Sequence, residues 1–260
     1  MYYQLLKKQD DLKKLPTLVF LHGFLGCHND WLPIIKKLNI TNSCLLIDLP
    51  GHTHSKTISP ITLSTISYHI AQIIKKEQIN QIILIGYSLG GRIALHFAHH
   101  YPDNIQALIL ISTHLGLHSI SEKIKRLQHD TQLAIQMKTT PWPQFIKKWY
   151  DTPLFKTFKK SIHYTKTITQ RHQQNPNLMA KTLIQLSLAH QPNYTTLCQQ
   201  YPFPIHYLCG QNDDKFYKLG QRYNTFLTQH TIPNADHALH ITHSQKISLF
   251  LDQILLPFNS

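Results

Sequence analysis

Near the middle of the chain stands the stretch Gln81-Ile82-Ile83-Leu84-Ile85-Gly86-Tyr87-Ser88-Leu89-Gly90-Gly91-Arg92. Its apolar, β-branched first half predicts a buried parallel strand, and the residues after Gly90 have helical spacing. Gly86 and Gly90 allow a turn too tight for a Cβ between strand and helix, which leaves Ser88 Oγ exposed above the sheet. We therefore predict a reactive serine, with the Leu89 amide at the helix N-terminus facing developing negative charge.

Other apolar runs extend this strand–helix alternation along the chain. Strands are expected at residues 17–21, 43–48, 105–111 and 204–209, and helices at 31–38, 61–76 and 245–256. Such alternation predicts an α/β fold, with a mostly parallel sheet covered by helices on both faces. Residues 114–200 have helical patterns but no strand run. We expect them to form a helical lid insertion over the carboxyl ends of the strands, in a core made of residues 1–113 and 201–260.

The charge balance points to an anionic partner. The 260 residues include 26 Lys and Arg against 13 Asp and Glu. The lysines are scattered, without a basic stripe interleaved with aromatics, so no nucleic-acid partner is predicted. Only four arginines occur, Arg92, Arg126, Arg171 and Arg222, and this sparing use suggests planar, bidentate tasks such as gripping a carboxylate.

Several protein classes are not indicated. The four cysteines lack C-x-x-C spacing and are expected to be buried thiols in a reducing compartment. The first residues do not resemble a signal peptide and no apolar run reaches membrane length, so we expect a cytoplasmic protein without stable membrane insertion. The 19 histidines are dispersed, and no metal site, dinucleotide fingerprint or P-loop is predicted, so no cofactor is expected. No pattern specifies an oligomeric state.

Three residue types in a definite order suggest a catalytic triad. Ser88 is followed by an aspartate after a late strand, at 213 or 214, and by His237 after the last strand. The histidine would take the serine proton, and the aspartate would hold the imidazole tautomer. The strand ending at His22-Gly23 places the Phe24 amide as a second oxyanion donor.

These motifs make the chain resemble the α/β-hydrolase family over nearly its whole length. Within that family it is similar to pyruvate-eliminating carbon–oxygen lyases of menaquinone biosynthesis. The matching stretches are 21–26 with Asp30-Trp31, 48–52, 86–92, 126–130, 149–155, 187–192 and 209–216.

The resemblance implies a site as well as a fold. It places the acid on Asp213, and it implies a small tricarboxylate substrate bound by Arg92, Arg126 and Arg171, with Tyr87 and Trp149 lining the pocket. The alternative for Arg126 and Arg171 is that both are ordinary surface residues that face solvent.

Two residues depart from the family pattern, and two other functions stay open. Asp236 replaces a glycine before His237, where it is expected to raise the proton affinity of that histidine or to compete with Asp213. Thr53 replaces the glycine of a Pro-Gly-His-Gly loop. The other functions are an esterase or thioesterase that uses Ser88 as nucleophile, and a ligand-binding module without turnover.

Overall fold

The computed structural model describes residues 1–7, 15–39, 41–55 and 58–258, and it is built on one seven-stranded sheet. The strand order is β1-β3-β2-β4-β5-β6-β7; β1 is antiparallel to β3 and every other pair is parallel. The predicted mostly parallel sheet is therefore confirmed. The strands are β1 (Tyr3–Leu6), β2 (Thr17–Leu21), β3 (Cys44–Ile47), β4 (Ile82–Tyr87), β5 (Ile105–Ile111), β6 (Ile205–Gly210) and β7 (Thr228–Ile232).

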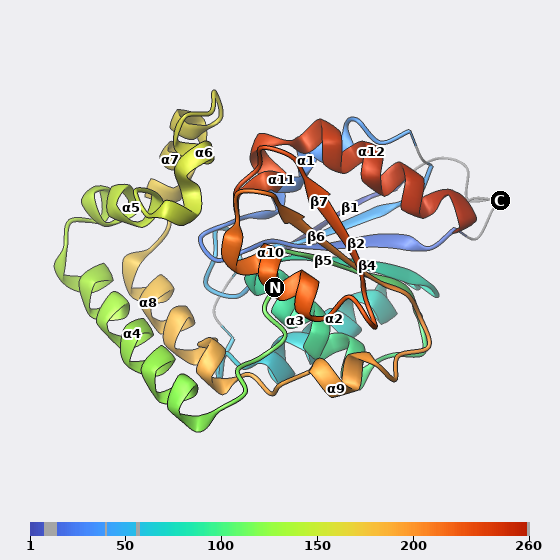
Figure 1. Cartoon of the computed structure of the whole chain (residues 1–260), viewed down its shortest axis with the longest axis horizontal. Coiled ribbons are helices and arrows are strands. Elements are labelled where there is room, and N and C mark those ends of the chain that lie inside the picture. The colour runs from blue at the N-terminus through green and yellow to red at the C-terminus, as the bar shows by residue number, and fades with distance from the viewer. Residues whose placement is uncertain (8–14, 40, 56–57, 259–260) are drawn as a thin grey trace.

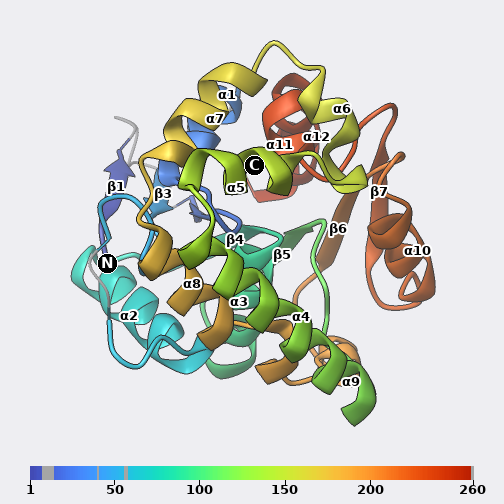
Figure 2. The ribbon, with the colours of Figure 1, turned by 90° about the vertical axis from the view of Figure 1, so that its left-hand side faces the viewer.

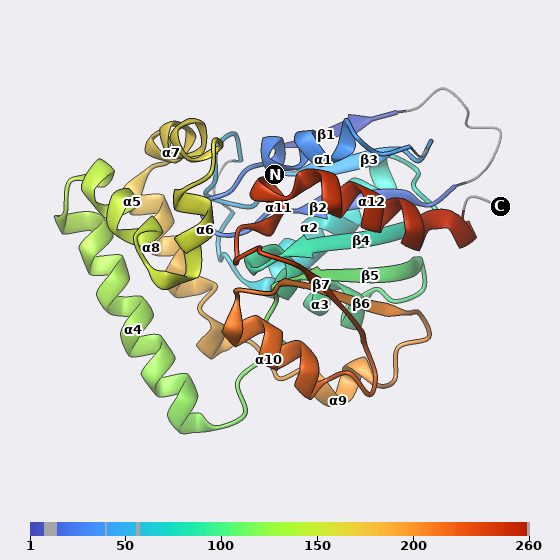
Figure 3. The same cartoon turned by 45° about the horizontal axis from the view of Figure 1, so that its top comes forward.

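Helices cover both faces of the sheet, as Figures 1 and 3 show. One face packs against α2 and α3, and the other packs against α1 and α12. The helices of this layered part are α1 (Leu32–Ile35), α2 (Leu63–Lys76), α3 (Leu89–His100), α10 (Asp214–Arg222), α11 (Leu239–Thr242) and α12 (Ser244–Leu255).

The central strand β4 shows why this segment is apolar throughout. Ile82 and Leu84 belong to one hydrophobic core, whereas Ile83 and Ile85 belong to the core on the opposite face. Successive side chains of a strand point to opposite faces, so a doubly covered strand needs apolar residues at every position. Each fully buried isoleucine contributes about 1.5–3 kcal/mol to the stability of the fold.

Residues 112–204, between β5 and β6, contain helices and no strand; we call them the helical segment. Its helices are α4 (Ile120–Thr139), α5 (Trp142–Tyr150), α6 (Lys156–Lys159), α7 (Tyr164–His172), α8 (Pro176–Gln185) and α9 (Thr195–Cys198). Phe145, Phe158 and Met179 belong to a third hydrophobic core, which also contains Leu25 and Ala238. In Figure 1, α4–α8 of this segment stand at one end of the sheet, whereas α9 lies beneath the layered part; Figure 2 shows the molecule from the side of α4–α8.

Some helix boundaries differ from the predictions. The helix expected over 61–76 begins at Leu63, because the extended Thr62 caps it by accepting a hydrogen bond from the Thr65 amide. The helix expected over 31–38 is a 3-10 turn followed by the short α1, which ends at Ile35. The closing helix spans Ser244–Leu255, one residue earlier at each end than expected.

Two expectations from the sequence concern the cysteines and membrane-spanning segments. All four cysteines are buried thiols, as predicted. In the part of the chain that the structure describes, no helix is both long and apolar enough to cross a membrane.

Candidate active site

The turn between β4 and α3 holds Ser88 in a strained conformation. Its φ is 50° and its ψ is −106°, a region that favours glycine. A Cβ at Gly86 would lie 2.5 Å from the Gly91 Cα, and one at Gly90 would lie 2.1 Å from the Leu21 carbonyl oxygen. The two glycines thus permit the tight turn, as the sequence predicts, and the strain presents Ser88 at the end of the strand.

Ser88, His237 and Asp213 lie in one hydrogen-bonded row. The distance from His237 Nε2 to Ser88 Oγ is 3.2 Å, and the distance from His237 Nδ1 to Asp213 Oδ2 is 2.7 Å. The carboxylate accepts, so Nδ1 carries the proton and Nε2 is left to accept from the serine. Asp213 follows β6 and is buried, whereas Asp214 opens α10 and is exposed. Of the two candidate acids, only Asp213 meets the imidazole.

Asp236, the residue before the histidine, has other partners. Its Oδ2 accepts hydrogen bonds from the amides of Thr157 (2.7 Å) and Phe158 (2.8 Å), and its Oδ1 accepts one from the Ala238 amide (3.0 Å). The prediction that Asp236 competes with Asp213 for the imidazole is therefore wrong. The carboxylate instead attaches the histidine loop to α6 of the helical segment.

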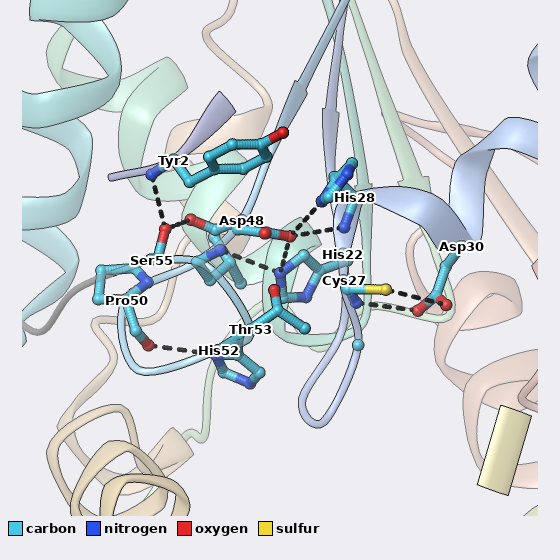
Figure 4. A network of polar contacts seen from close by, with 12 residues as sticks. Tyr2, His22, Cys27, His28, Asp30, Asp48, Pro50, His52, Thr53 and Ser55 are labelled. Carbon is cyan, nitrogen blue, oxygen red and sulfur yellow. Dashed lines mark hydrogen bonds and ion pairs between the residues drawn. The ribbon is translucent and has the colours of Figure 1, made fainter. Parts of the chain in front are cut away.

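The loop that carries Phe24 is held by two buried imidazoles. His22 Nε2 accepts from the Leu49 amide at 3.0 Å, so its protonated Nδ1 donates to the Gly23 carbonyl at 2.8 Å. Figure 4 shows this ring beside Asp48, which accepts hydrogen bonds from the amide and Nδ1 of His28. Burial outweighs the attraction of Asp48 and lowers the pKa of His22, so the ring stays neutral.

His52 holds the same loop from the other side. Its Nε2 accepts from the Leu25 amide at 3.1 Å, and its Nδ1 donates to the Pro50 carbonyl at 3.1 Å. Burial lowers the pKa of His52 to about 3. A neutral imidazole is required here because protonation would place a donor against the Leu25 amide. Phe24 lines the cavity in front of Ser88, with Leu89.

Thr53 directly follows His52 in the loop after β3. Its φ is 38°, in the region that favours glycine. Its amide donates to Gln174 Oε1 of the helical segment at 3.0 Å. This backbone contact joins the loop after β3 to the helical segment.

The cavity in front of the triad is lined by Arg92, Arg126 and Arg171. Arg92 is buried on α3 and donates only to neutral groups, Gln191 Oε1 at 2.5 Å and the Leu186 carbonyl at 2.7 Å. Burial, followed by repulsion from Arg126, lowers the pKa of Arg92 to about 9.

The other two arginines have carboxylate partners. Arg126 Nε reaches both oxygens of Asp130 at 2.9 Å, and its side chain is 31% exposed. Arg171 is 2% exposed and its Nη2 lies 2.6 Å from Asp30 Oδ2. Burial raises the pKa of Asp30, but the charge and hydrogen bond of Arg171, together with His240 and His22, outweigh burial and hold the pKa below its ordinary value. The solvent-facing alternative is thus wrong for Arg171.

The two predicted aromatic residues also line the cavity. The ring of Tyr87 lies over His240, with 3.8 Å between centroids, and Trp149 of α5 packs against Phe24 at 5.5 Å. All ten site residues predicted from the sequence belong to the triad or line the cavity. They are Phe24, Tyr87, Ser88, Leu89, Arg92, Arg126, Trp149, Arg171, Asp213 and His237.

Sequence reasoning missed several residues of the same cavity. Asp30, His114, Lys215 and His240 also line it. Lys215 could have been found, because it follows Asp213 by two residues at the end of a strand. The pairing of Asp30 with Arg171 spans 141 residues and has no local signal. Among the described residues, no group of three His, Cys, Asp or Glu side chains is arranged to hold a metal ion.

A family model described as alpha/beta hydrolase fold matches residues 16–244, so the chain belongs to that class of proteins. Two relatives are the 2-succinyl-6-hydroxy-2,4-cyclohexadiene-1-carboxylate synthases of Photorhabdus laumondii and Yersinia pseudotuberculosis. Both are 36% identical to this chain, over 94% of it and 87% of the first relative, and over 86% of it and 82% of the second. Within the class, the chain belongs to the family of these synthases.

Solved structures agree at the level of the fold. MenH from S. aureus superposes with a TM-score of 0.93 at 25% identity, covering all of both chains. A thermophilic esterase from Thermogutta terrifontis, described as malate-bound, has a TM-score of 0.82 at 20% identity, over 100% of this chain and 94% of its own. The esterase shows a shared fold alone.

Proposed function

We propose that this enzyme is a carbon–oxygen lyase that removes pyruvate from 2-succinyl-5-enolpyruvyl-6-hydroxy-3-cyclohexene-1-carboxylate. The product would be 2-succinyl-6-hydroxy-2,4-cyclohexadiene-1-carboxylate, the compound that its relatives are named for making. The observation that carries the proposal is a Ser88–His237–Asp213 row facing a cavity lined by three arginines. A substrate with three carboxylates suits such a cavity.

The triad would work as a base. His237 accepts the Ser88 proton at Nε2, and the serine oxygen removes the proton from the carbon beside the substrate ketone. The electron pair left on that carbon forms an enolate and then expels the enolpyruvyl oxygen. The departing enolate takes up the proton released by the His237 imidazolium and becomes pyruvate, which returns the triad to its starting state. No acyl-enzyme forms, and Asp213 stabilises the imidazolium while it exists.

The amides of Phe24 and Leu89 would stabilise the enolate oxygen. Leu89 is the first residue of α3, so its amide has no acceptor one turn back within the helix. The adjacent positive end of the helix favours the same charge. The neutral His22 and His52 would serve by holding the Phe24 loop in place.

The proposal extends to the surroundings of the site. The helical segment would act as a lid, because its Trp149, Leu183 and Leu186 line the cavity that opens at Ser88. The substrate would be a small anion met in the cytoplasm, a reducing compartment that suits four buried thiols.

Pyruvate release from freshly made substrate, corrected for spontaneous elimination, tests the lyase. Wild type is expected to release pyruvate far above background, and Ser88→Ala is expected to lose most of that rate. Arg92→Ala and Arg126→Ala should each lower kcat/KM about 30-fold, equivalent to about 2 kcal/mol, by leaving a substrate carboxylate unpaired. A Ser88→Ala enzyme that keeps its rate would overturn the role of the serine as base.

Ester hydrolysis separates the lyase from the serine esterase alternative. An esterase would cleave p-nitrophenyl acetate rapidly, and a hydrolase of neutral esters would tolerate Arg92→Ala and Arg126→Ala. Cleavage of that ester without pyruvate release would replace the lyase with a hydrolase. Turnover of neither substrate class would favour a binding module.

A further inference from the structure

A lysine stands at the cavity beside two of its arginines. Lys215 lies in the first turn of α10, two residues after Asp213, and it lines the cavity together with Arg92 and Arg126. A cation in the first turn of a helix is unfavourable, because that end of the helix already carries partial positive charge. An anion near Lys215 would therefore stabilise this arrangement.

The carboxylates of Asp213 and Asp130 attract Lys215, but neither forms an ion pair with it. Among the described residues, neither Lys215 nor Arg92 forms an ion pair with a carboxylate. Although Lys215 is exposed, crowding by neighbouring atoms and then the charge of Arg126 lower its pKa. Burial, followed by Lys215, Arg92 and Arg126, also lowers the pKa of the adjacent His114 to about 3.

Another part of the cavity lining has a different balance of charge. Arg171 is neutralised by the buried Asp30 at 2.6 Å, so it adds little net charge to the site. Two cations of this lining, Arg92 and Lys215, have no ion pair among the described residues. Arg126 pairs with Asp130 but uses only Nε for it, which leaves both terminal nitrogens of its guanidinium for another anion.

We infer that Lys215 is a substrate-binding residue that pairs with a carboxylate at the Arg92–Arg126 side of the cavity. In this arrangement Arg171, held by Asp30, offers its remaining N–H groups as donors from another part of the lining. The inference rests on the proposed function and names which cations meet the substrate charge. A lysine can do this as a point charge from the cavity edge, where bidentate geometry is not required.

Steady-state pyruvate release by Lys215→Gln, Lys215→Arg and Lys218→Gln tests the inference. Lys218 is exposed on the same helix and does not line the cavity, so it controls for loss of general positive charge. We expect Lys215→Gln to raise KM about tenfold with kcat within twofold, since a lost ion pair acts on binding. Lys215→Arg should restore most of the affinity, and Lys218→Gln should match wild type. A Lys215→Gln enzyme with KM within twofold of wild type would overturn the inference.

A second substrate keeps this result separate from the fate of the lyase proposal. If wild type releases no pyruvate, the lyase proposal fails. The inference is then tested by comparing hydrolysis of mono-p-nitrophenyl succinate, an anion, with hydrolysis of neutral p-nitrophenyl acetate. Loss of a preference for the anionic ester in Lys215→Gln alone supports Lys215 as the anion-binding residue. An unchanged preference, or the absence of any preference in wild type, contradicts it.

Discussion

Two walls of one cavity differ in whether their buried cations have a carboxylate partner. On the first wall, Arg171 is 2% exposed and pairs with the buried Asp30. On the second wall, Arg92 is 8% exposed and has only an amide oxygen and a backbone carbonyl as partners, with Lys215 and Arg126 close by. We call these the paired wall and the cationic wall.

The difference separates residues that stabilise the fold from residues whose charge is paired only when an anionic ligand binds. A buried ion pair is complete in the free protein, and removing one partner leaves an uncompensated charge. A buried cation with neutral partners raises the free energy of the free protein, and an anionic ligand relieves this cost when it binds. The same substitution on the two walls should therefore change different measured quantities.

The largest effect is expected from Arg171→Met on the paired wall. The methionine fills most of the space but leaves the Asp30 carboxylate buried without its cation. We expect the free energy of unfolding to fall by about 3–5 kcal/mol. Urea denaturation followed by tryptophan fluorescence measures this. Combining Arg171→Met with Asp30→Leu should restore much of the loss; a double variant no more stable than the single one would contradict a pairing role.

Acid should weaken the protein through the imidazoles near the paired wall. His52 and His240 are buried and neutral, with pKa values lowered by burial to about 3, against 6.5 in the unfolded chain. Below pH 6.5 the unfolded chain therefore binds more protons, and stability is lost as the pH falls from 6.5 toward 3. Two such groups give a slope of roughly 2–3 kcal/mol per pH unit.

Urea midpoints measured between pH 7 and pH 4.5 check this slope. His52→Gln should remove about half of the contribution of the two imidazoles, because a glutamine oxygen can still accept from the Leu25 amide without titrating. His129→Gln, on the exposed face of α4, is the matched control and should leave the slope unchanged. Equal slopes in wild type and His52→Gln would show that His52 does not set the acid sensitivity.

On the cationic wall, Arg92→Met should cost less stability and more activity. It removes hydrogen bonds to Gln191 and the Leu186 carbonyl, but it also removes the penalty of burying an unpaired cation. We expect a stability loss of about 1 kcal/mol, well below that of Arg171→Met, with kcat/KM reduced about 30-fold as for Arg92→Ala. A loss of stability as large as that of Arg171→Met would erase the distinction between the walls.

The sequence predicts one kind of relation well and another poorly. The turn around Ser88 and the order of Ser88, Asp213 and His237 are visible because parallel strands bring their carboxyl ends to one edge of the sheet. The resemblance places Arg171 in the site, but nothing in the sequence identifies Asp30 as its partner, since a pairing over 141 residues leaves no periodic signal. The predicted competition of Asp236 with Asp213 is wrong for a related reason: the partners of Asp236 include the backbone amides of residues 157 and 158, which no side-chain pattern reveals.

The smallest effect is expected where the loop after β3 meets the helical segment, at Thr53→Gly. Glycine removes the cost of a left-handed φ at a β-branched residue, about 1–2 kcal/mol. It also adds freedom to the unfolded chain, at about 0.5–1 kcal/mol. These terms nearly cancel, so we expect stability within about 1 kcal/mol of wild type in urea denaturation and unchanged kcat/KM. Because the Thr53 amide still reaches Gln174 in the variant, a loss above about 2 kcal/mol would mean that the threonine side chain, and not this backbone contact, holds the loop in place.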